Sequence, residues 1–142
     1  LVDYMLEKLR VYDGLILPTI QKGCGHSFYR FLLRLDSNKI RVPAERIVQA
    51  LNAEGMDFYA GYLPLNLFPV YQKKIAFGKK GCPFACPWYK GKTDYSMSGL
   101  TNVTEAMKQS FSTEVIRPPL TVKDMDEIDR AFKKVWDNLH RL

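Results

Sequence analysis

The side chains with the clearest metal-binding chemistry in this 142-residue chain are its three cysteines and one nearby histidine. Cys82 and Cys86 are spaced C-x3-C, and Cys24 with His26 would complete the four soft ligands that a structural zinc ion requires. However, the Cys-Gly-His spacing of the second pair is too short for a usual chelate loop, and a radical iron-sulfur motif would need cysteine in place of Tyr89. We therefore expect no metal and two packed free thiols, with a metal-stabilised binding module on Cys82 and Cys86 as an alternative.

Lysines and aromatic residues are interleaved around the same cysteines, as they are on some nucleic-acid-binding surfaces. No recognisable RNA- or DNA-binding signature accompanies them, and the net charge of +6 is moderate. Nucleic acid is thus a disfavoured partner, and a basic nucleic-acid-binding domain is a second alternative. The same lysines would equally serve the phosphates of a nucleotide-linked sugar. The residues concerned are Lys79, Lys80, Phe84, Trp88, Tyr89, Lys90 and Lys92.

Size and composition predict one domain over residues 1–142 that can bury its own core, since 46% of the residues are hydrophobic. Three cysteines make no disulfide scaffold, and their odd number fits a reducing compartment. No apolar run approaches the length of a membrane span, and no signal peptide opens the chain. We expect a soluble, cytoplasmic protein without a membrane partner, whose start at Leu1 indicates a cut or processed terminus.

Apolar residues that recur every three or four positions predict three amphipathic helices. The first is expected over residues 1–13, and the second has Pro43 as its first residue and Gly55 as its stop. The last is expected to begin at Thr121, which forms a capping-box pattern with Asp124. The buried stripes are expected to be Leu1, Met5, Leu9 and Tyr12; Ala44, Ile47, Val48 and Leu51; and Met125, Ile128, Phe132, Val135, Trp136 and Leu139.

Polar residues predict one more helix, and they predict two ion pairs on the last helix of the chain. Asn102 is expected to cap a helix whose third position is Glu105. On the solvent side of the last helix, oppositely charged residues four positions apart are expected to pair. These pairs are Asp126 with Arg130 and Asp129 with Lys133.

Alternating residues predict a strand over 26–35, and another is expected near 57–62. The segment 78–99 is rich in glycine, cysteine and lysine and reads as a long loop. These elements predict an α+β fold, with a small, mainly antiparallel sheet covered on one face by helices. In the first strand, one face is expected to carry Phe28, Arg30, Leu32 and Arg34, and the other Tyr29, Phe31, Leu33 and Leu35.

A run near the middle of the chain has an order of apolar, turn and polar residues too particular for a generic loop. It reads Gly61-Tyr62-Leu63-Pro64-Leu65-Asn66-Leu67-Phe68-Pro69-Val70-Tyr71. It resembles a segment of the DegT/DnrJ/EryC1/StrS family of pyridoxal-phosphate (PLP) aminotransferases, which has tyrosine, two residues, Leu-His-Leu-Gln-Pro, one residue and tyrosine. Asn66 stands where histidine is common, and the positions that fit are Tyr62, Leu65, Leu67, Pro69 and Tyr71.

Two further segments extend this resemblance over nearly the whole chain. Residues 81–89 look like an insertion found in one branch of the family, and residues 102–132 look like its closing segment. The resemblance implies the C-terminal small domain of a fold-type-I aminotransferase, inactive alone, with residues 1–13 ending an interdomain helix. A larger domain, absent from this chain, would precede it and bind the cofactor.

The resemblance also implies substrates and site residues. The full-length enzyme would be a homodimer that transfers an amino group from a donor such as glutamate or glutamine to a keto sugar, a nucleotide-linked sugar or a cyclitol. Tyr62, Asn66 and Tyr29 are the candidate substrate-binding residues, although the strand face of Tyr29 is expected to be core. Transamination needs an imine-forming lysine, an acid and a phosphate cradle, and we recognise none here. We therefore expect no catalytic residue and no bound PLP in this fragment.

Overall fold

The computed structural model describes residues 1–142 and divides them into two compact units. Unit 1 consists of Leu1–Tyr62 and Ala106–Leu142, and unit 2 consists of Leu63–Glu105. Unit 1 therefore combines the two ends of the chain. Helix α4, at Thr101–Gln109, contains the second boundary between the units.

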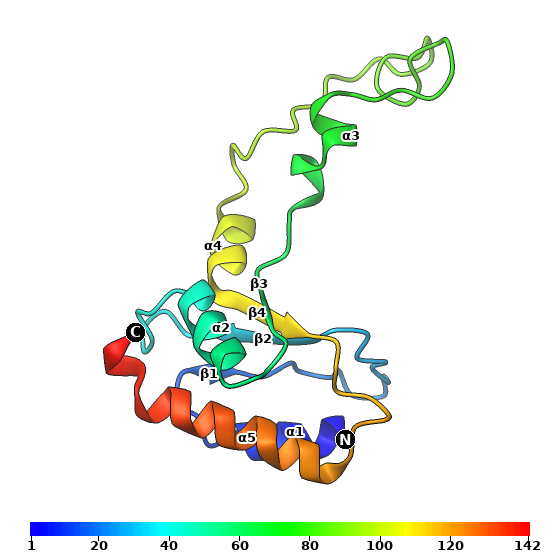
Figure 1. Ribbon diagram of the computed structural model, residues 1–142. Helices are drawn as coiled ribbons and strands as arrows, with labels where there is room; N and C mark the ends of the chain where they lie inside the picture. Colours follow the sequence, from blue (N-terminus) through cyan, green and yellow to red (C-terminus); the bar gives the residue numbers. More distant parts are fainter. The chain divides into compact units, whose positions relative to one another are not determined.

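Unit 1 contains a four-stranded antiparallel sheet in the order β1-β2-β4-β3 (Figure 1). The strands are β1 (Leu15–Ile16), β2 (Phe31–Leu35), β3 (Tyr59–Ala60) and β4 (Ser110–Thr113). Strand β2 alternates strictly, with Phe31, Leu33 and Leu35 buried and the residues between them exposed. This confirms the predicted antiparallel sheet, and the predicted two faces hold within the strand itself.

The predicted strand over 26–35 begins only at Phe31 because the chain turns before it. Phe28 has a φ of 48°, a conformation that costs energy for a bulky residue and breaks an extended strand. Its backbone N–H donates to Nδ1 of His26 at 2.8 Å, which closes the turn. The alternation predicted to bury Tyr29 is therefore interrupted, and the Tyr29 side chain is 71% exposed.

Three helices bury apolar residues against one face of this sheet: α1 (Val2–Leu9), α2 (Ala44–Ala53) and α5 (Val122–Asp137). Leu1, predicted to be part of the first stripe, is exposed. Figure 1 shows α1 and α5 lying alongside one another below the strands. The stripe predicted for α2 is fully buried, while in α5 Trp136 and the following Leu139 are only partly buried. The predicted α+β class with helices covering one face of an antiparallel sheet is confirmed. A short 3-10 helix, η2 (Leu139–Arg141), follows α5.

Helix boundaries differ from the sequence-based prediction by a few residues. Helix α1 ends at Leu9 and is followed by a turn rather than continuing to residue 13. Pro43 precedes α2 as its N-cap residue with extended backbone, φ −62° and ψ 147°. Helix α4 begins at Thr101, so Asn102 is inside the helix and is not the predicted cap. In its first turn, Thr104 donates to the carbonyl oxygen of Leu100 instead, through both its N–H and its hydroxyl at 3.0 Å.

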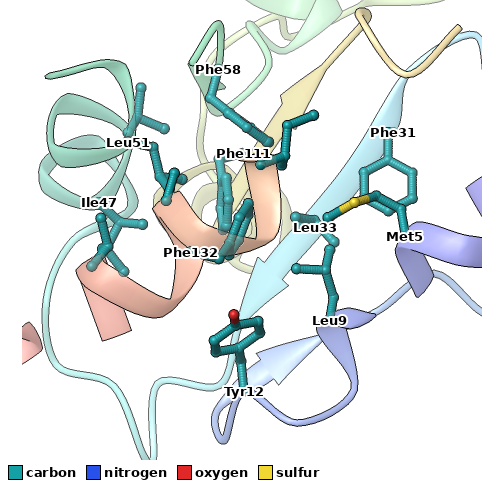
Figure 2. Close-up of a cluster of buried hydrophobic side chains, with 14 of the residues drawn as sticks. Met5, Leu9, Tyr12, Phe31, Leu33, Ile47, Leu51, Phe58, Phe111 and Phe132 are labelled. Carbon is teal, nitrogen blue, oxygen red and sulfur yellow. The ribbon is translucent and has the colours of Figure 1, made fainter. Parts of the chain in front are cut away.

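The centre of the core is a group of aromatic rings contributed by α5, β4 and the residue before β3 (Figure 2). The ring of Phe132 on α5 meets Phe58 edge-on at 5.6 Å between centroids and stacks on Phe111 of β4 at 6.4 Å. Phe58 and Phe111 are themselves 5.8 Å apart. Figure 2 shows Ile47 and Leu51 of α2 on one side of these rings and Met5 and Leu9 of α1 on the other. These contacts attach all three helices to the sheet.

Polar contacts join α1 to α5 above this core. The Tyr4 hydroxyl donates to Oδ1 of Asp126 at 2.6 Å, and Nζ of Lys8 lies 3.1 Å from the same oxygen. The Tyr12 hydroxyl donates to Asp129 at 2.7 Å. The predicted pairs of Asp126 with Arg130 and Asp129 with Lys133 are therefore wrong, because both carboxylates face α1. The hydrogen bond from Tyr4, followed by that from Lys8, lowers the pKa of Asp126 below its ordinary value.

Unit 2 contains η1 (Leu65–Leu67), α3 (Pro69–Gln72) and the first half of α4. Between Gly78 and Gly99 the chain forms no helix or regular strand, and an isolated antiparallel bridge joins Phe77 to Cys82. All buried hydrophobic residues of the chain's core cluster belong to unit 1. Across both units, no helix combines the length and the apolar character that crossing a bilayer demands.

Candidate functional site

Tyr62 lies in unit 1, immediately after β3, with 58% of its side chain exposed. Gly61 precedes it with a φ of 63°, and its N–H donates to the carbonyl oxygen of Ser110 at 2.6 Å. A Cβ atom at Gly61 would lie 3.1 Å from the backbone oxygen of Met107, so the close approach to the end of α4 favours glycine. The position of the Tyr62 backbone is therefore set by the edge of the sheet.

Arg30 lies beneath the exposed ring of Tyr62, with its Cζ atom 5.0 Å from the ring centroid. This distance is within the range of a cation–π contact. Its Nη2 atom lies 2.7 Å from Oε1 of Glu114, and its Nη1 atom donates to Oγ of Ser112 at 3.4 Å. The buried Nε atom has no hydrogen-bond partner. The guanidinium therefore links the tyrosine ring to a carboxylate on the segment that follows β4.

A cavity of about 610 Å³ lies beside this carboxylate. Its volume is in the range of small-molecule sites. The exposed Tyr29 and the tilted ring pair of His26 and Phe28 contribute to its wall, with the ring centroids of this pair 4.1 Å apart. The polar side chains that line it are Asp3, His26, Ser27, Tyr29, Glu114 and Arg117.

Two of the three predicted site residues thus lie in unit 1 and are connected through residues that sequence reasoning missed. Tyr62 contacts Arg30, Arg30 contacts Glu114, and Glu114 lines the cavity together with Tyr29. The sequence did contain a signal for Arg30, because it was predicted to lie on the outward face of its strand. An arginine on the open face of a sheet is free to reach a partner. No spacing in the sequence connects Glu114 to it, since the two residues meet only through strand pairing.

Asn66, the third predicted site residue, belongs to a hydrogen-bond cluster within unit 2. Its Nδ2 atom lies 3.1 Å from the carbonyl oxygens of both Tyr95 and Ser96. The side chain of Gln72 reinforces this cluster by donating to the carbonyl oxygens of Asn66 at 2.7 Å and Tyr95 at 2.8 Å. The amide donor of Asn66 therefore ties η1 to the end of the long loop, and its Oδ1 atom remains as the group that can accept from a ligand.

Cys82 and Cys86 lie next to one another in unit 2, and both are partly exposed free cysteines. The hydrogen bond with the Cys86 thiol, followed by partial burial, raises the pKa of the Cys82 thiol. Cys24 and His26, the other ligands considered for zinc, belong to unit 1. No group of three or more histidine, cysteine, aspartate or glutamate side chains in the structure is placed to hold a metal ion.

The lysine-rich segment of unit 2 is exposed. Lys80 lies over the ring of Trp88, with Nζ 5.6 Å from the centroid, and 76% of the Trp88 side chain is exposed. Phe84 is instead part of a cluster with Tyr71 and Tyr95, at centroid distances of 6.4 and 5.9 Å. The aromatic residues of this segment are therefore divided between a packed group and an exposed one.

Lys8, Lys39 and Lys133 of this chain are paired with carboxylates. A lysine nucleophile needs a lowered pKa. The pKa values of Lys8, Lys39 and Lys133 are raised, in each case first by a hydrogen bond to a neighbouring carboxylate, that of Asp126, Asp13 or Asp137. What the site residues of unit 1 can do is bind and orient a ligand.

No protein-family model matches the chain. It is 29% identical over 148 residues to an L-glutamine:scyllo-inosose aminotransferase of Streptomyces griseus, a match that covers 99% of this chain and 32% of that protein. It is 27% identical over 78 residues to the spore coat polysaccharide biosynthesis protein SpsC of Bacillus subtilis, covering 54% of this chain and 20% of that protein.

The fold has a counterpart among solved structures. A crystal structure of DesV from S. venezuelae, in complex with a ketimine intermediate, superposes with a TM-score of 0.65 at 18% sequence identity. The match covers 96% of this chain and 30% of that chain, and it is evidence of fold alone. The chain thus spans about a third or less of the length of each of these proteins.

Proposed function

Because these relatives confirm the predicted resemblance to DegT/DnrJ/EryC1/StrS-like sugar aminotransferases, we propose that the chain is the C-terminal small domain of such an enzyme. The observation that carries the proposal is the match to the scyllo-inosose aminotransferase, which extends over 99% of this chain. The reaction is the transfer of an amino group from a donor such as glutamate or glutamine to a keto sugar, a nucleotide-linked sugar or a cyclitol.

The proposal assigns PLP and its attachment to a larger domain that precedes this chain in the full-length enzyme. No chemical step is assigned to the lysines of this chain. The part of this chain is to form the substrate side of the active site, to orient the substrate and to exclude water. Tyr62, Tyr29 and Asn66 are the residues proposed to contact the substrate. The full-length enzyme is proposed to be a cytoplasmic homodimer.

The test is transamination by the full-length protein that contains this chain. Purified enzyme with PLP is incubated with L-glutamine and a set of keto substrates, namely scyllo-inosose, a free keto sugar and a nucleotide-linked keto sugar. Formation of the amino product by mass spectrometry is the expected result. If none of the substrates gains an amino group with either glutamine or glutamate, the proposed function is wrong.

A substitution then tests the site. In the full-length enzyme, Tyr62→Ala is expected to lower kcat/KM for the keto substrate by about tenfold, because an exposed ring that contacts substrate contributes on the order of 1.4 kcal/mol. Phe77→Ala is the control, since Phe77 is an aromatic residue of unit 2 with 88% exposure and no place in the cavity wall. Unchanged kinetics in both variants would remove Tyr62 from the site.

A further inference from the structure

The carboxylate of Glu114 occupies the position between the guanidinium of Arg30 and the cavity. Nη2 of Arg30 lies 2.7 Å from its Oε1 atom, and no hydrogen bond within the chain engages Oε2. Both side chains are about one-third exposed, at 30% and 31%. One oxygen is therefore held in place while the other is free to accept a hydrogen bond from a molecule in the cavity.

The charges around the cavity favour a neutral ligand. Among the residues that line it, Asp3 and Glu114 are acidic and Arg117 is basic, and Arg30 adjoins Glu114. The two positive and two negative side chains leave no excess of either sign for a polyanion. The exposed ring of Tyr29 offers a flat apolar surface in the same wall. A carboxylate acceptor beside an aromatic ring is suited to a polyhydroxylated ring, which has hydroxyl donors at its rim and C–H groups on its faces.

We propose that Glu114 is a specificity-determining residue that accepts a hydrogen bond from a ring hydroxyl of the keto substrate, and that Arg30 is the positioning residue that holds it. This inference rests on the proposed function. It adds Glu114 and Arg30 to the residues proposed for the site, and it names a ring hydroxyl as the part of the substrate that Glu114 recognises. An ordinary surface ion pair would contribute little. The Arg30 pair differs because Nε is buried and the guanidinium is also fixed by Tyr62 and Ser112, so the carboxylate has a restricted position.

The experiment measures binding and turnover in the full-length protein. The probes are scyllo-inosose and a set of analogues that each lack one of its ring hydroxyls, with dissociation constants obtained by calorimetry in the absence of an amino donor. A site that hydrogen-bonds a hydroxyl discriminates against the analogue without it. The wild type should therefore bind at least one of the deoxy analogues about tenfold more weakly than scyllo-inosose.

Two variants separate the roles. Glu114→Gln should bind scyllo-inosose about tenfold more weakly and lose the discrimination against the deoxy analogue, since an amide is a weaker acceptor than a carboxylate. Arg30→Lys keeps the charge but loses the forked geometry, and should weaken discrimination to an intermediate degree. In both variants the KM for L-glutamine should stay within about twofold of wild type, whereas a general structural defect would change both substrates. Glu127→Gln is the control, because Glu127 pairs with Arg130 on the exposed side of α5.

The outcomes distinguish this inference from the proposed function. If the wild type aminates a keto substrate but Glu114→Gln retains affinity and discrimination, the inference is overturned and the function stands. If scyllo-inosose binds with the predicted discrimination but no keto substrate is aminated, the binding role of Glu114 stands and the function falls. Failure of the wild type to bind scyllo-inosose or to discriminate between the probes overturns the inference directly.

Discussion

At the scale of single residues, Asn66 is held more firmly than a surface turn residue would be. Its Nδ2 atom contacts the carbonyl oxygens of Tyr95 and Ser96, and Gln72 donates to the backbone on both sides of this contact. A role toward substrate therefore depends on the Oδ1 atom, while the amide nitrogen has a structural role. The contact within unit 2 and the proposed contact with substrate therefore involve different atoms of the same side chain.

The structural contribution of Asn66 is open to a direct test. Asn66→Ala removes hydrogen bonds that contribute about 0.5–1.5 kcal/mol each, so the loop it closes should open more often. We expect tryptic cleavage after Lys90 and Lys92 to become several-fold faster, as followed by mass spectrometry. Asn138→Ala is the matched control, because Asn138 donates to the carbonyl oxygen of Lys134 in unit 1 at 2.8 Å. Equal cleavage rates in the two variants would contradict the role given to Asn66.

Gly14 provides a second test at this scale. It has a φ of 79°, and a Cβ atom there would lie 2.6 Å from Cγ1 of Ile40. Gly55 has a similar φ of 88° but open space around it. Gly55→Ala should therefore cost about 1–2 kcal/mol of unfolding free energy for the backbone conformation alone. Gly14→Ala should cost at least about 1 kcal/mol more, because of overpacking against Ile40. Urea unfolding of both variants checks the difference, and equal losses would mean that Ile40 relaxes without cost.

At the scale of elements, the contact between α1 and α5 should respond to acid. Tyr4 and Lys8 lower the pKa of Asp126, so the ionised form is favoured in the folded state. The stability that results is present above the unfolded pKa, about 3.9 for aspartate, and is lost as the pH falls through the lower folded value. Asp126→Asn should therefore melt below wild type at pH 7, and the two melting temperatures should converge below about pH 4. A difference that persists at pH 2 would point to packing rather than charge.

The elements also show which parts of the fold can be predicted from sequence. The apolar stripe of α2 and the alternation within β2 are local patterns, and the structure buries the residues that they indicate. The partners of Asp126 and Asp129 could not be found in this way, because rules for residues four apart consider one helix and both carboxylates face another. Strand β1 contains only Leu15 and Ile16, so it is too short to show the alternation of buried and exposed residues that identifies a strand in a sequence.

The candidate site was predictable only in part, for a related reason. Tyr62, Asn66 and Tyr29 came from a resemblance to a family, and their role as substrate-binding residues stays a prediction. Exposure of Tyr29 was not foreseen, because the positive φ of Phe28 breaks the alternation on which its burial was based. Arg30 and Glu114 meet across strands far apart in sequence, and this contact depends on the register of β2 with β4.

At the scale of the whole molecule, the two units differ in what stabilises them. The buried aromatic and aliphatic side chains of the core cluster all belong to unit 1. Regions with few buried apolar contacts open at lower free energy than the global unfolding reaction. Amide hydrogen exchange of the full chain should therefore be slower in β2 and β4 than in α3 by at least about tenfold, or 1.4 kcal/mol. Uniform protection of the two units in exchange measured by mass spectrometry would contradict this expectation.

The connection between β3 and β4 has a consequence for how such a protein can change. The two strands are antiparallel neighbours, and the N–H of Gly61 reaches the carbonyl oxygen of Ser110 at 2.6 Å, yet all of unit 2 lies between them in the sequence. Neighbouring antiparallel strands need only a two-residue turn. Unit 2 is therefore an insertion in the connection between two strands that a short hairpin turn could join. Substitutions, insertions or deletions within unit 2 can therefore change the surface that unit 2 forms while the sheet keeps its register. The cost is small because the closure entropy of a connection rises only slowly with its length.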